Sequence, residues 1–296
     1  MRISIDLGGT KVEGIVLDNE QVLLRKRLII PRGNPHEILL TIHSLITQLE
    51  AEIAQQCSIG ICGPGSINAH GLLRNSNTTE LNGIDFLGEL EALCKRQIRF
   101  SNDANCFALA EAVTGAGRSY NTVFGAILGT GCGSGLIVDR KIITGVNGVG
   151  GEWGHNSLAW INQNELLQER KCFCGKRHCN EMFISGSGLS LSYQLMGGEK
   201  SSGKDVISKS EAGEDLAVEC VNQYVDQLAR ALSAIVNVFD PECIVLGGGL
   251  SNYSKIYDRV QAQWDKYIFS DVINTRLLPP QGGDSAGAIG ASWLWG

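Results

Sequence analysis

The strongest constraint on the fold is a hairpin pattern that occurs twice. ISIDLGGTKVEGIVLDN at Ile3–Asn19 and FGAILGTGCGSGLIVDR at Phe124–Arg140 each run from a strand through a turn rich in Gly and Thr into a second strand, which ends in IVLD or LIVD. Two short glycine-rich hairpins can also be similar by chance. A duplicated domain pair explains the pattern better, because hairpins that face each other across a cleft are both available to one ligand.

Hydrophobic periodicity predicts the elements around these hairpins. The chain opens with an antiparallel meander of strands at 2–7, 12–17 and 22–30. Apolar spacing predicts helices at 35–56, 104–114 and 215–239, the last of which stops at Asp240-Pro241. Strands are expected at 57–62, at 98–103 and in ECIVLGGG. A closing helix should follow a cap at Asp284 and Ser285.

Length and composition restrict the class of protein. A chain of 296 residues favours two domains, and a net charge of -6 argues against a basic surface for nucleic acid or membranes. The N-terminus lacks the pattern of a signal peptide and no apolar run is long enough to span a bilayer, so we expect a cytoplasmic protein. In that compartment the ten cysteines are expected to be reduced, and close cysteine spacing indicates metal or redox chemistry.

Glycine clusters that directly follow apolar runs predict nucleotide binding. DLGGTK fits neither the Walker A loop nor the dinucleotide fingerprint. Its backbone N–H groups and the Thr10 hydroxyl could still hold phosphate, and Asp6 could orient Mg²⁺ directly or through water. GTGCGSG offers a second set of N–H groups, and LGGG offers bare backbone for adenosine. The candidate nucleotide-binding residues are Asp6, Gly8, Gly9, Thr10, Lys11, Thr130, Gly131, Cys132, Gly133, Gly247, Gly248 and Gly249.

Asp103 is the candidate general base. In SNDAN it ends a strand just before a predicted helix, where a carboxylate also serves as an ordinary helix cap. A base that activates an alcohol must lie within hydrogen-bonding reach of the hydroxyl, and in phosphoryl transfer positioning and charge neutralisation do most of the work. Asp103 therefore has the catalytic role only if the phosphate loops converge on it.

A zinc site is predicted from KCFCGKRHCNE and GGEWGHN. Structural zinc takes four N or S ligands, and Cys172, Cys174, Cys179 and His155 supply such a set. His178 competes as the fourth ligand, although adjacent His178 and Cys179 would be strained in reaching one ion together. Reduced cysteines without a metal are the remaining alternative.

These motifs, in this order and over nearly the whole chain, resemble the ROK (repressor, open reading frame, kinase) family of sugar kinases. The resemblance is carried by DLGGT, GPG at Gly63–Gly65, NDAN, GTGCGSG, GEWGH, the CxCGxxxC cluster with Glu181, and LGGG. It implies an α/β, two-lobe actin-like ATPase (ribonuclease H-like) fold with a duplicated α/β core and a central cleft. FISGSG, GHNSLAW and SWLW are most similar to bacterial fructokinases of the mannokinase type.

The resemblance also implies roles for single residues. Asp103 would be the base acting on the sugar 6-hydroxyl, and His155 would use one ring nitrogen for zinc and the other for sugar. The zinc should affect sugar binding rather than phosphate. The implied sugar-binding residues are Gly65, Asn77, Asn102, Glu152, His155 and Glu181. One departure from the family pattern is His178, which stands where a glycine is usual; histidine tolerates a positive φ at some cost, so the aim of Glu181 is in question.

The expected activity is phosphorylation of D-fructose at the 6-hydroxyl by ATP and Mg²⁺, with structural Zn²⁺. Mannose, glucose and N-acetylglucosamine are alternative substrates on the same scaffold. A sugar-responsive repressor would need a helix-turn-helix before the first strand, which begins at Arg2. We expect a smaller lobe of residues 1–117 and 285–296 with the first hairpin and Asp103. A larger lobe of residues 118–284 would hold the second hairpin, zinc and adenosine sites, and the family implies a homodimer.

Overall fold

Strand β1 (Arg2–Leu7) is the centre of the first sheet in the computed structural model, which describes residues 1–283 and 286–296. It pairs antiparallel with β2 (Lys11–Asp18) and parallel with β4 (Ser58–Gly63). With β3 (Gln21–Ile29) and β7 (Ile98–Asn102) the strand order is β3-β2-β1-β4-β7. The predicted meander and both following strands are confirmed.

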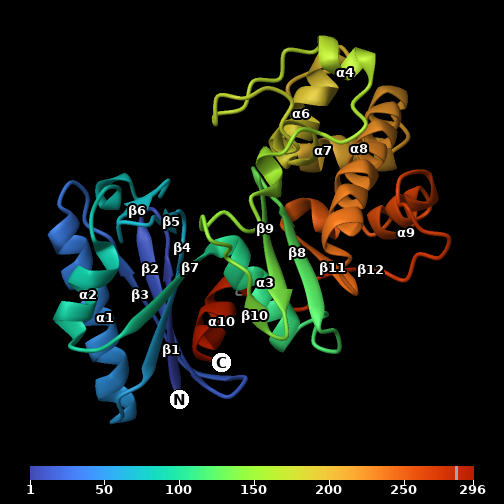
Figure 1. Ribbon diagram of the computed structural model, residues 1–296. Coiled ribbons are helices and arrows are strands. Elements are labelled where there is room, and N and C mark those ends of the chain that lie inside the picture. Colours follow the sequence, from blue (N-terminus) through green and yellow to red (C-terminus); the bar gives the residue numbers. More distant parts are fainter. Residues whose placement is uncertain (284–285) are drawn as a thin grey trace. The chain divides into compact units, whose positions relative to one another are not determined.

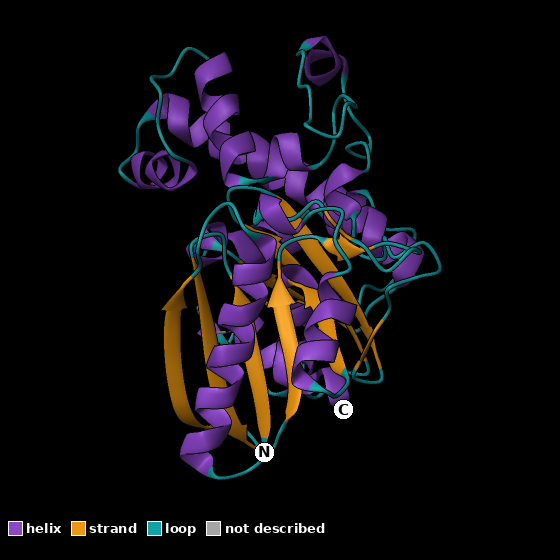
Figure 2. Cartoon of the chain, turned by 90° about the vertical axis from the view of Figure 1, so that its left-hand side faces the viewer, coloured by secondary structure: helices purple, strands orange, loops and turns teal. Residues whose placement is uncertain are grey.

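Helices cover both faces of this sheet. Helices α1 (Pro35–Ile53) and α2 (Phe86–Cys94) lie on one face, and α3 (Asp103–Val113) and α10 (Ala286–Ser292) lie on the other (Figures 1 and 2). Ile3 and Ile5 belong to the core under α1, whereas Ile15 and Leu17 pack with Ala288 of α10. The cap predicted for this last helix, Asp284 and Ser285, lies outside the described residues.

Local sequence sets the ends of α1, which begins at the predicted Pro35 and stops before the predicted end at Gln56. Asn34 caps it by accepting a hydrogen bond from the His36 N–H, and Pro35 occupies the first turn, where its missing N–H costs nothing. The helix ends at Ala54, which adopts a left-handed φ of 51°.

The second sheet repeats the topology of the first. Its order is β10-β9-β8-β11-β12, formed by β8 (Thr122–Leu128), β9 (Cys132–Val138), β10 (Lys141–Ile142), β11 (Cys243–Gly247) and β12 (Arg276–Leu278). β11 is parallel to both β8 and β12, as β4 is to β1 and β7. The same order of hairpin and parallel strands in both sheets is what a duplicated α/β core predicts.

The remaining elements are mostly helices of the second half. The longest is α8 (Asp215–Phe239), which ends where Asp240 turns left-handed before Pro241. No helix in the described part of the chain is both long and apolar enough to cross a membrane. The other elements are β5 (Ser66–Ile67), β6 (Leu73–Arg74), α4 (Gln163–Leu167), α5 (Glu181–Ile184), α6 (Gly186–Leu195), α7 (Gly203–Glu211) and α9 (Ile256–Gln261).

The chain divides into two compact units. One contains Met1–Arg118, Gly135–Gly150 and Gln281–Gly296, and the other contains Ser119–Ser134 and Gly151–Pro280. The sequence places residues 135–150 in the larger lobe, whereas in the structure they belong to the first unit. The reason is close packing on α3, since a Cβ on Gly135 would lie 2.8 Å from the Cβ of Ala108.

The buried carboxylate of Glu111 accepts hydrogen bonds from two chain segments, one just after α3 and one that begins at Gln281. Glu111, on α3, is fully buried. One of its oxygens accepts from the backbone N–H of Gln281 and of Gly282, at 3.0 and 2.7 Å, and the other accepts from Ala116 at 2.9 Å. A buried charge of this kind is stable only while these donors remain in place.

Glu111→Gln should therefore destabilise the protein. The amide puts an N–H₂ group opposite a backbone N–H that has no other acceptor, so we expect the free energy of unfolding to fall by about 2–4 kcal/mol. Denaturant unfolding measures this, and Glu20→Gln, at an exposed position, should change it by less than about 0.5 kcal/mol. Equal stabilities of the two variants would show that the Glu111 contacts contribute nothing.

Candidate active site

Three polar side chains gather at the carboxyl end of the first sheet. Asp6 lies near the end of β1, Cys62 near the end of β4, and Asp103 directly after β7. Because these strands are parallel, their carboxyl ends meet at one edge, and the ligand atoms of the three residues lie within 4.8 Å of one another. This edge is where α/β sheets commonly bind ligands.

Asp103 is not the cap of α3. The cap is Asn102, whose Oδ1 accepts from the Asn105 N–H at 2.8 Å, and Asp103 is the first helical residue. The ordinary structural role considered for Asp103 is therefore filled by its neighbour. Desolvation raises the pKa of the Asp103 carboxyl, and a hydrogen bond from the Cys62 thiol, 3.4 Å from Oδ1, opposes that rise.

The first hairpin presents open backbone beside this edge. The Gly8 N–H donates to the Lys11 carbonyl at 3.0 Å, which leaves Gly9, Thr10 and Lys11 exposed. The Thr78 hydroxyl donates to the Gly8 carbonyl at 3.2 Å, so Asn77 lies on a segment that touches the hairpin. Gly65 has a φ of 94°, and a Cβ there would collide with the Arg74 carbonyl, so no other residue fits.

Stability should depend on pH through Asp6. Burial, followed by the charges of Asp103 and Glu13, raises the pKa of Asp6 from 3.8 to about 6. Between these values the folded chain binds more protons than the unfolded chain, so this residue's contribution to stability falls as pH rises. Asn at this position has no proton to lose, so the variant should not show this fall. The difference in unfolding free energy between Asp6→Asn and the parent should therefore shift in favour of the variant by about 1–2 kcal/mol between pH 4 and pH 7, after allowance for the partial exposure of Asp6.

Denaturant unfolding without nucleotide or Mg²⁺ measures this difference at the two pH values. Asp18→Asn, at an exposed position away from this carboxylate cluster, is the control. A constant difference for Asp6→Asn would contradict the prediction.

The second hairpin and the LGGG turn pack backbone against backbone. Gly248 has a φ of 80°, and a Cβ there would lie 2.6 Å from the Leu128 carbonyl oxygen, beside Gly129. On the other side, a Cβ on Gly186 would lie 3.0 Å from the Gly129 carbonyl, and one on Gly203 would lie 2.8 Å from the Gly186 carbonyl. Glycine is required at these positions because the chains approach so closely.

This packing borders a cavity of about 550 Å³ within the second unit, a size typical of small-molecule sites. The cavity brings together Thr130 and Gly249, two of the predicted nucleotide residues. The lining from α6 and α7 was not predicted from the sequence, although the small-residue run after Phe183 was a usable signal. Those unpredicted lining residues are Gly186, Ser187, Ser190, Leu191, Gln194, Ser202, Gly203 and Lys204.

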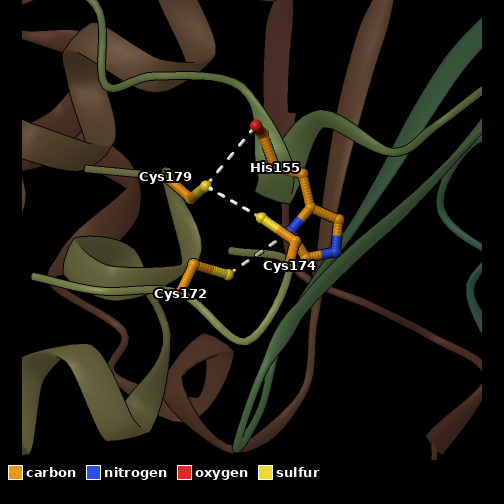
Figure 3. A group of neighbouring side chains, drawn as sticks. All are labelled: His155, Cys172, Cys174 and Cys179. Atoms are coloured by element: carbon orange, nitrogen blue, oxygen red, sulfur yellow. Dashed lines mark hydrogen bonds between the residues drawn. The ribbon is translucent and has the colours of Figure 1, made fainter. Parts of the chain in front are cut away.

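His155 and the three cysteines of the predicted zinc site point toward one another (Figure 3). Their ligand atoms all lie within 4.8 Å of one another. Cys172 Sγ is 3.6 Å from His155 Nδ1, and Cys174 Sγ is 3.6 Å from Cys179 Sγ. A tetrahedral zinc with Zn–S bonds of about 2.3 Å separates its sulfur ligands by about 3.8 Å, so these four residues fit the ion.

Backbone contacts hold the two halves of this cluster together. The Leu158 N–H donates to the His178 carbonyl at 3.0 Å, and the Asn180 N–H donates to the Asn156 carbonyl at 2.8 Å. These bonds join the segment after GEWGH to the cysteine loop. The Nε2 atom of His155 faces away from the sulfurs and lies 3.9 Å from Glu152 Oε2. His155 can therefore serve a metal with one nitrogen and a ligand with the other.

His178 adopts the conformation that a glycine would. Its φ is 58°, in the left-handed region, and its Nε2 lies 3.0 Å from the Gln168 carbonyl oxygen. The ring therefore points toward the Gln168 carbonyl rather than into the sulfur cluster. The backbone at His178 therefore has the left-handed conformation that glycine adopts readily.

Replacing His178 should reveal the cost of this backbone. We expect His178→Ala to be less stable to denaturant than His178→Gly by about 1 kcal/mol, since both lose the ring contact and only alanine is strained at positive φ. His70 is exposed and does not have a positive φ, so it is the control position. There the alanine variant should be at least as stable to denaturant as the glycine variant. An alanine variant at 178 as stable as the glycine variant would exclude the strain.

Glu181 links the cysteine loop to the second hairpin. Its Oε2 accepts from the Cys132 N–H at 3.1 Å, and its Oε1 lies 3.7 Å from Cys172 Sγ. Gly131 carries no side chain because a Cβ would lie 2.6 Å from the same carboxylate. In the second unit the structure thus brings Glu152, His155 and Glu181 around one loop, which also contacts the hairpin predicted to hold phosphate.

Comparison with known proteins places these features in a family. A model of the ROK family matches residues 2–296. N-acetyl-D-glucosamine kinase of Aliivibrio salmonicida is 35% identical over 99% of both chains. The enzyme of the same name from Yersinia pseudotuberculosis is 36% identical over 99% of this chain and 98% of its own. These relatives support the alternative of another hexose better than they support fructose.

Solved structures share the fold at lower identity. The ROK hexokinase of Thermus thermophilus superposes with a TM-score of 0.88 at 24% identity, covering 99% of this chain and 97% of its own. A ROK glucokinase of Streptomyces griseus, solved with glucose and AMPPNP, gives 0.74 at 23% identity, covering 98% and 97%. Together they show that the expected actin-like ATPase fold is correct.

Proposed function

The chain belongs to the ROK family, as a sugar kinase, and we propose that it transfers the γ-phosphoryl group of ATP to the 6-hydroxyl of N-acetyl-D-glucosamine. The observation that carries this choice of sugar is the 35–36% identity, over 99% of the chain, to N-acetyl-D-glucosamine kinases. Fructose, which the FISGSG and SWLW segments favour, is the competing substrate.

In the proposed reaction Asp103 accepts the proton of the 6-hydroxyl as its oxygen attacks the γ-phosphorus. The new bond is between sugar O6 and phosphorus, and the bond to the β-phosphate oxygen breaks to release ADP. Asp103 suits the role because it is exposed, is not used as a helix cap, and has one oxygen oriented by Cys62.

The remaining candidate residues divide between sugar and nucleotide. Gly65, Asn77, Asn102, Glu152, His155 and Glu181 are proposed to bind sugar hydroxyls. The hairpins at Gly8–Lys11 and Thr130–Gly133 are proposed to bind phosphates through backbone N–H groups other than those of Gly8 and Cys132, which already donate to Lys11 and Glu181. The cavity of about 550 Å³ that Thr130 and Gly249 line supports the proposal of an adenosine site at the Gly247–Gly249 turn.

Two metals are part of the proposal. Mg²⁺ bound with ATP would neutralise phosphate charge, and Asp6 would hold it directly or through water. Zn²⁺ would supply a fixed cross-link that orients His155, held by His155, Cys172, Cys174 and Cys179.

Product analysis tests the proposed reaction. With N-acetyl-D-glucosamine, ATP and Mg²⁺ we expect a monophosphate whose phosphorus couples to the C6 protons in NMR. The 6-deoxy sugar, which binds but lacks the acceptor hydroxyl, should release no ADP above background. A phosphate at another carbon, or no product, would refute the assignment.

A further inference from the structure

We propose that the Cys62 thiol is a positioning residue for the reaction, because it donates a hydrogen bond that orients the Asp103 carboxylate toward the sugar hydroxyl. This inference rests on the proposed role of Asp103. Cys62 Sγ lies 3.4 Å from Asp103 Oδ1, a distance suited to an S–H donor, and sulfur reaches the carboxylate from the neighbouring strand β4.

The direction of this hydrogen bond follows from the surroundings of the sulfur. Cys62 is 2% exposed and packs with Cys106 and Ala291. An ionised carboxylate oxygen can only accept a hydrogen bond, so at 3.4 Å from Asp103 Oδ1 the thiol must be the donor.

The structure also holds the sulfur in place. Gly287, on α10, leaves room for it, since a Cβ there would lie 3.2 Å from Cys62 Sγ. The Cys106 thiol is 3.8 Å from the Ser101 carbonyl oxygen, so it can donate in a different direction. The carboxylate, in contrast, belongs to an exposed side chain that is not fixed by the helix cap. A rigid donor therefore meets a carboxylate that accepts no other side-chain hydrogen bond from the described residues.

Fixing one carboxylate oxygen has a catalytic consequence. With Oδ1 bound to the thiol, the second oxygen is left in one orientation from which it can accept the proton of the attacking hydroxyl. Small losses of alignment at a reacting group lower the rate of the chemical step much more than they lower substrate binding. The thiol should thus affect kcat and leave the KM values for sugar and ATP nearly unchanged.

The test is a double-mutant cycle between Cys62→Ala and Asp103→Asn, measured as single-turnover rates. We expect Cys62→Ala to reduce the rate roughly three- to tenfold, with both KM values within about twofold of the parent. In the Asp103→Asn background the same change should have no further effect, because the oriented group is gone. Cys62→Ser, which restores a donor, should recover most of the rate.

Cys57→Ala is the matched control, since it removes a buried thiol at the other end of β4, away from Cys62 and Asp103, and it should leave the rate unchanged. If Cys62→Ala lowers the single-turnover rate equally in both backgrounds, Cys62 acts only through packing. The same conclusion follows if Cys62→Ser is as stable as Cys62→Ala but does not recover the rate. Near-parental turnover of Asp103→Asn alone would instead overturn the assignment of the base.

Discussion

Asp103→Asn should lower kcat by about 10²–10⁴-fold, with the KM for sugar raised no more than about threefold. The amide keeps the shape of the side chain but cannot accept the proton of the attacking hydroxyl. The fold should be unaffected, because Asn102 rather than Asp103 caps α3. ADP release under saturating sugar and ATP measures the effect.

Asp18→Asn is the control for this substitution, since Asp18 is exposed at the end of β2, and it should keep the parental kcat. Circular dichroism should be the same for both variants and the parent, and the denaturant midpoint of Asp103→Asn should be no lower than that of the parent, because the raised pKa of Asp103 makes its charged form unfavourable in the folded state. Turnover of Asp103→Asn within a few-fold of the parent would eliminate Asp103 as the base.

Loss of zinc should have the next largest effect. The purified chain is expected to contain one zinc, and Cys174→Ser should lose it, because a serine hydroxyl is a poor replacement for a thiolate ligand. Cys174 is the exposed member of the cluster, so its substitution disturbs the core least. We expect the sugar KM to rise at least about tenfold, since His155 and Glu181 lose the support of the cysteine loop.

The KM for ATP should also rise, by a smaller factor, because Glu181 bonds to the Cys132 N–H of the second hairpin. This contact extends the expectation from the sequence, in which zinc affects sugar binding. Metal analysis and steady-state kinetics check the prediction, with Cys94→Ser, at a half-buried cysteine in α2, expected to keep both zinc and activity. A zinc-free Cys174→Ser with parental KM values would contradict a supporting role for the metal.

Much of the fold was predictable because its signals are local. The meander of Arg2–Ile29, the amphipathic spacing of α1 and α8, and the stop at Asp240-Pro241 depend on residues close in sequence. The repeated hairpin also predicted the duplicated core, since both sheets have the same strand order. The assignment of 135–150 was missed because it depends on packing against α3, which is distant in sequence.

Candidate site residues were predictable where spacing itself carries the chemistry. The CxC spacing and GEWGH brought His155 and the cysteines together, because a zinc ligand set imposes its own geometry. Contacts made by ordinary-looking residues were not predictable. Glu111 resembles any helical glutamate until the N–H groups of Gln281 and Gly282 meet it, and Cys62 resembles a core residue until β7 places Asp103 beside it.

The identity of the sugar is the central claim, and the ratio of kcat/KM values across hexoses tests it most directly. ADP release is measured with N-acetyl-D-glucosamine, fructose, mannose and glucose at fixed ATP and Mg²⁺. We predict that kcat/KM for N-acetyl-D-glucosamine exceeds that of each other sugar by at least about tenfold, as expected when a site pairs with a polar group that the other sugars lack. A value for fructose equal to or above that for N-acetyl-D-glucosamine would contradict the assignment.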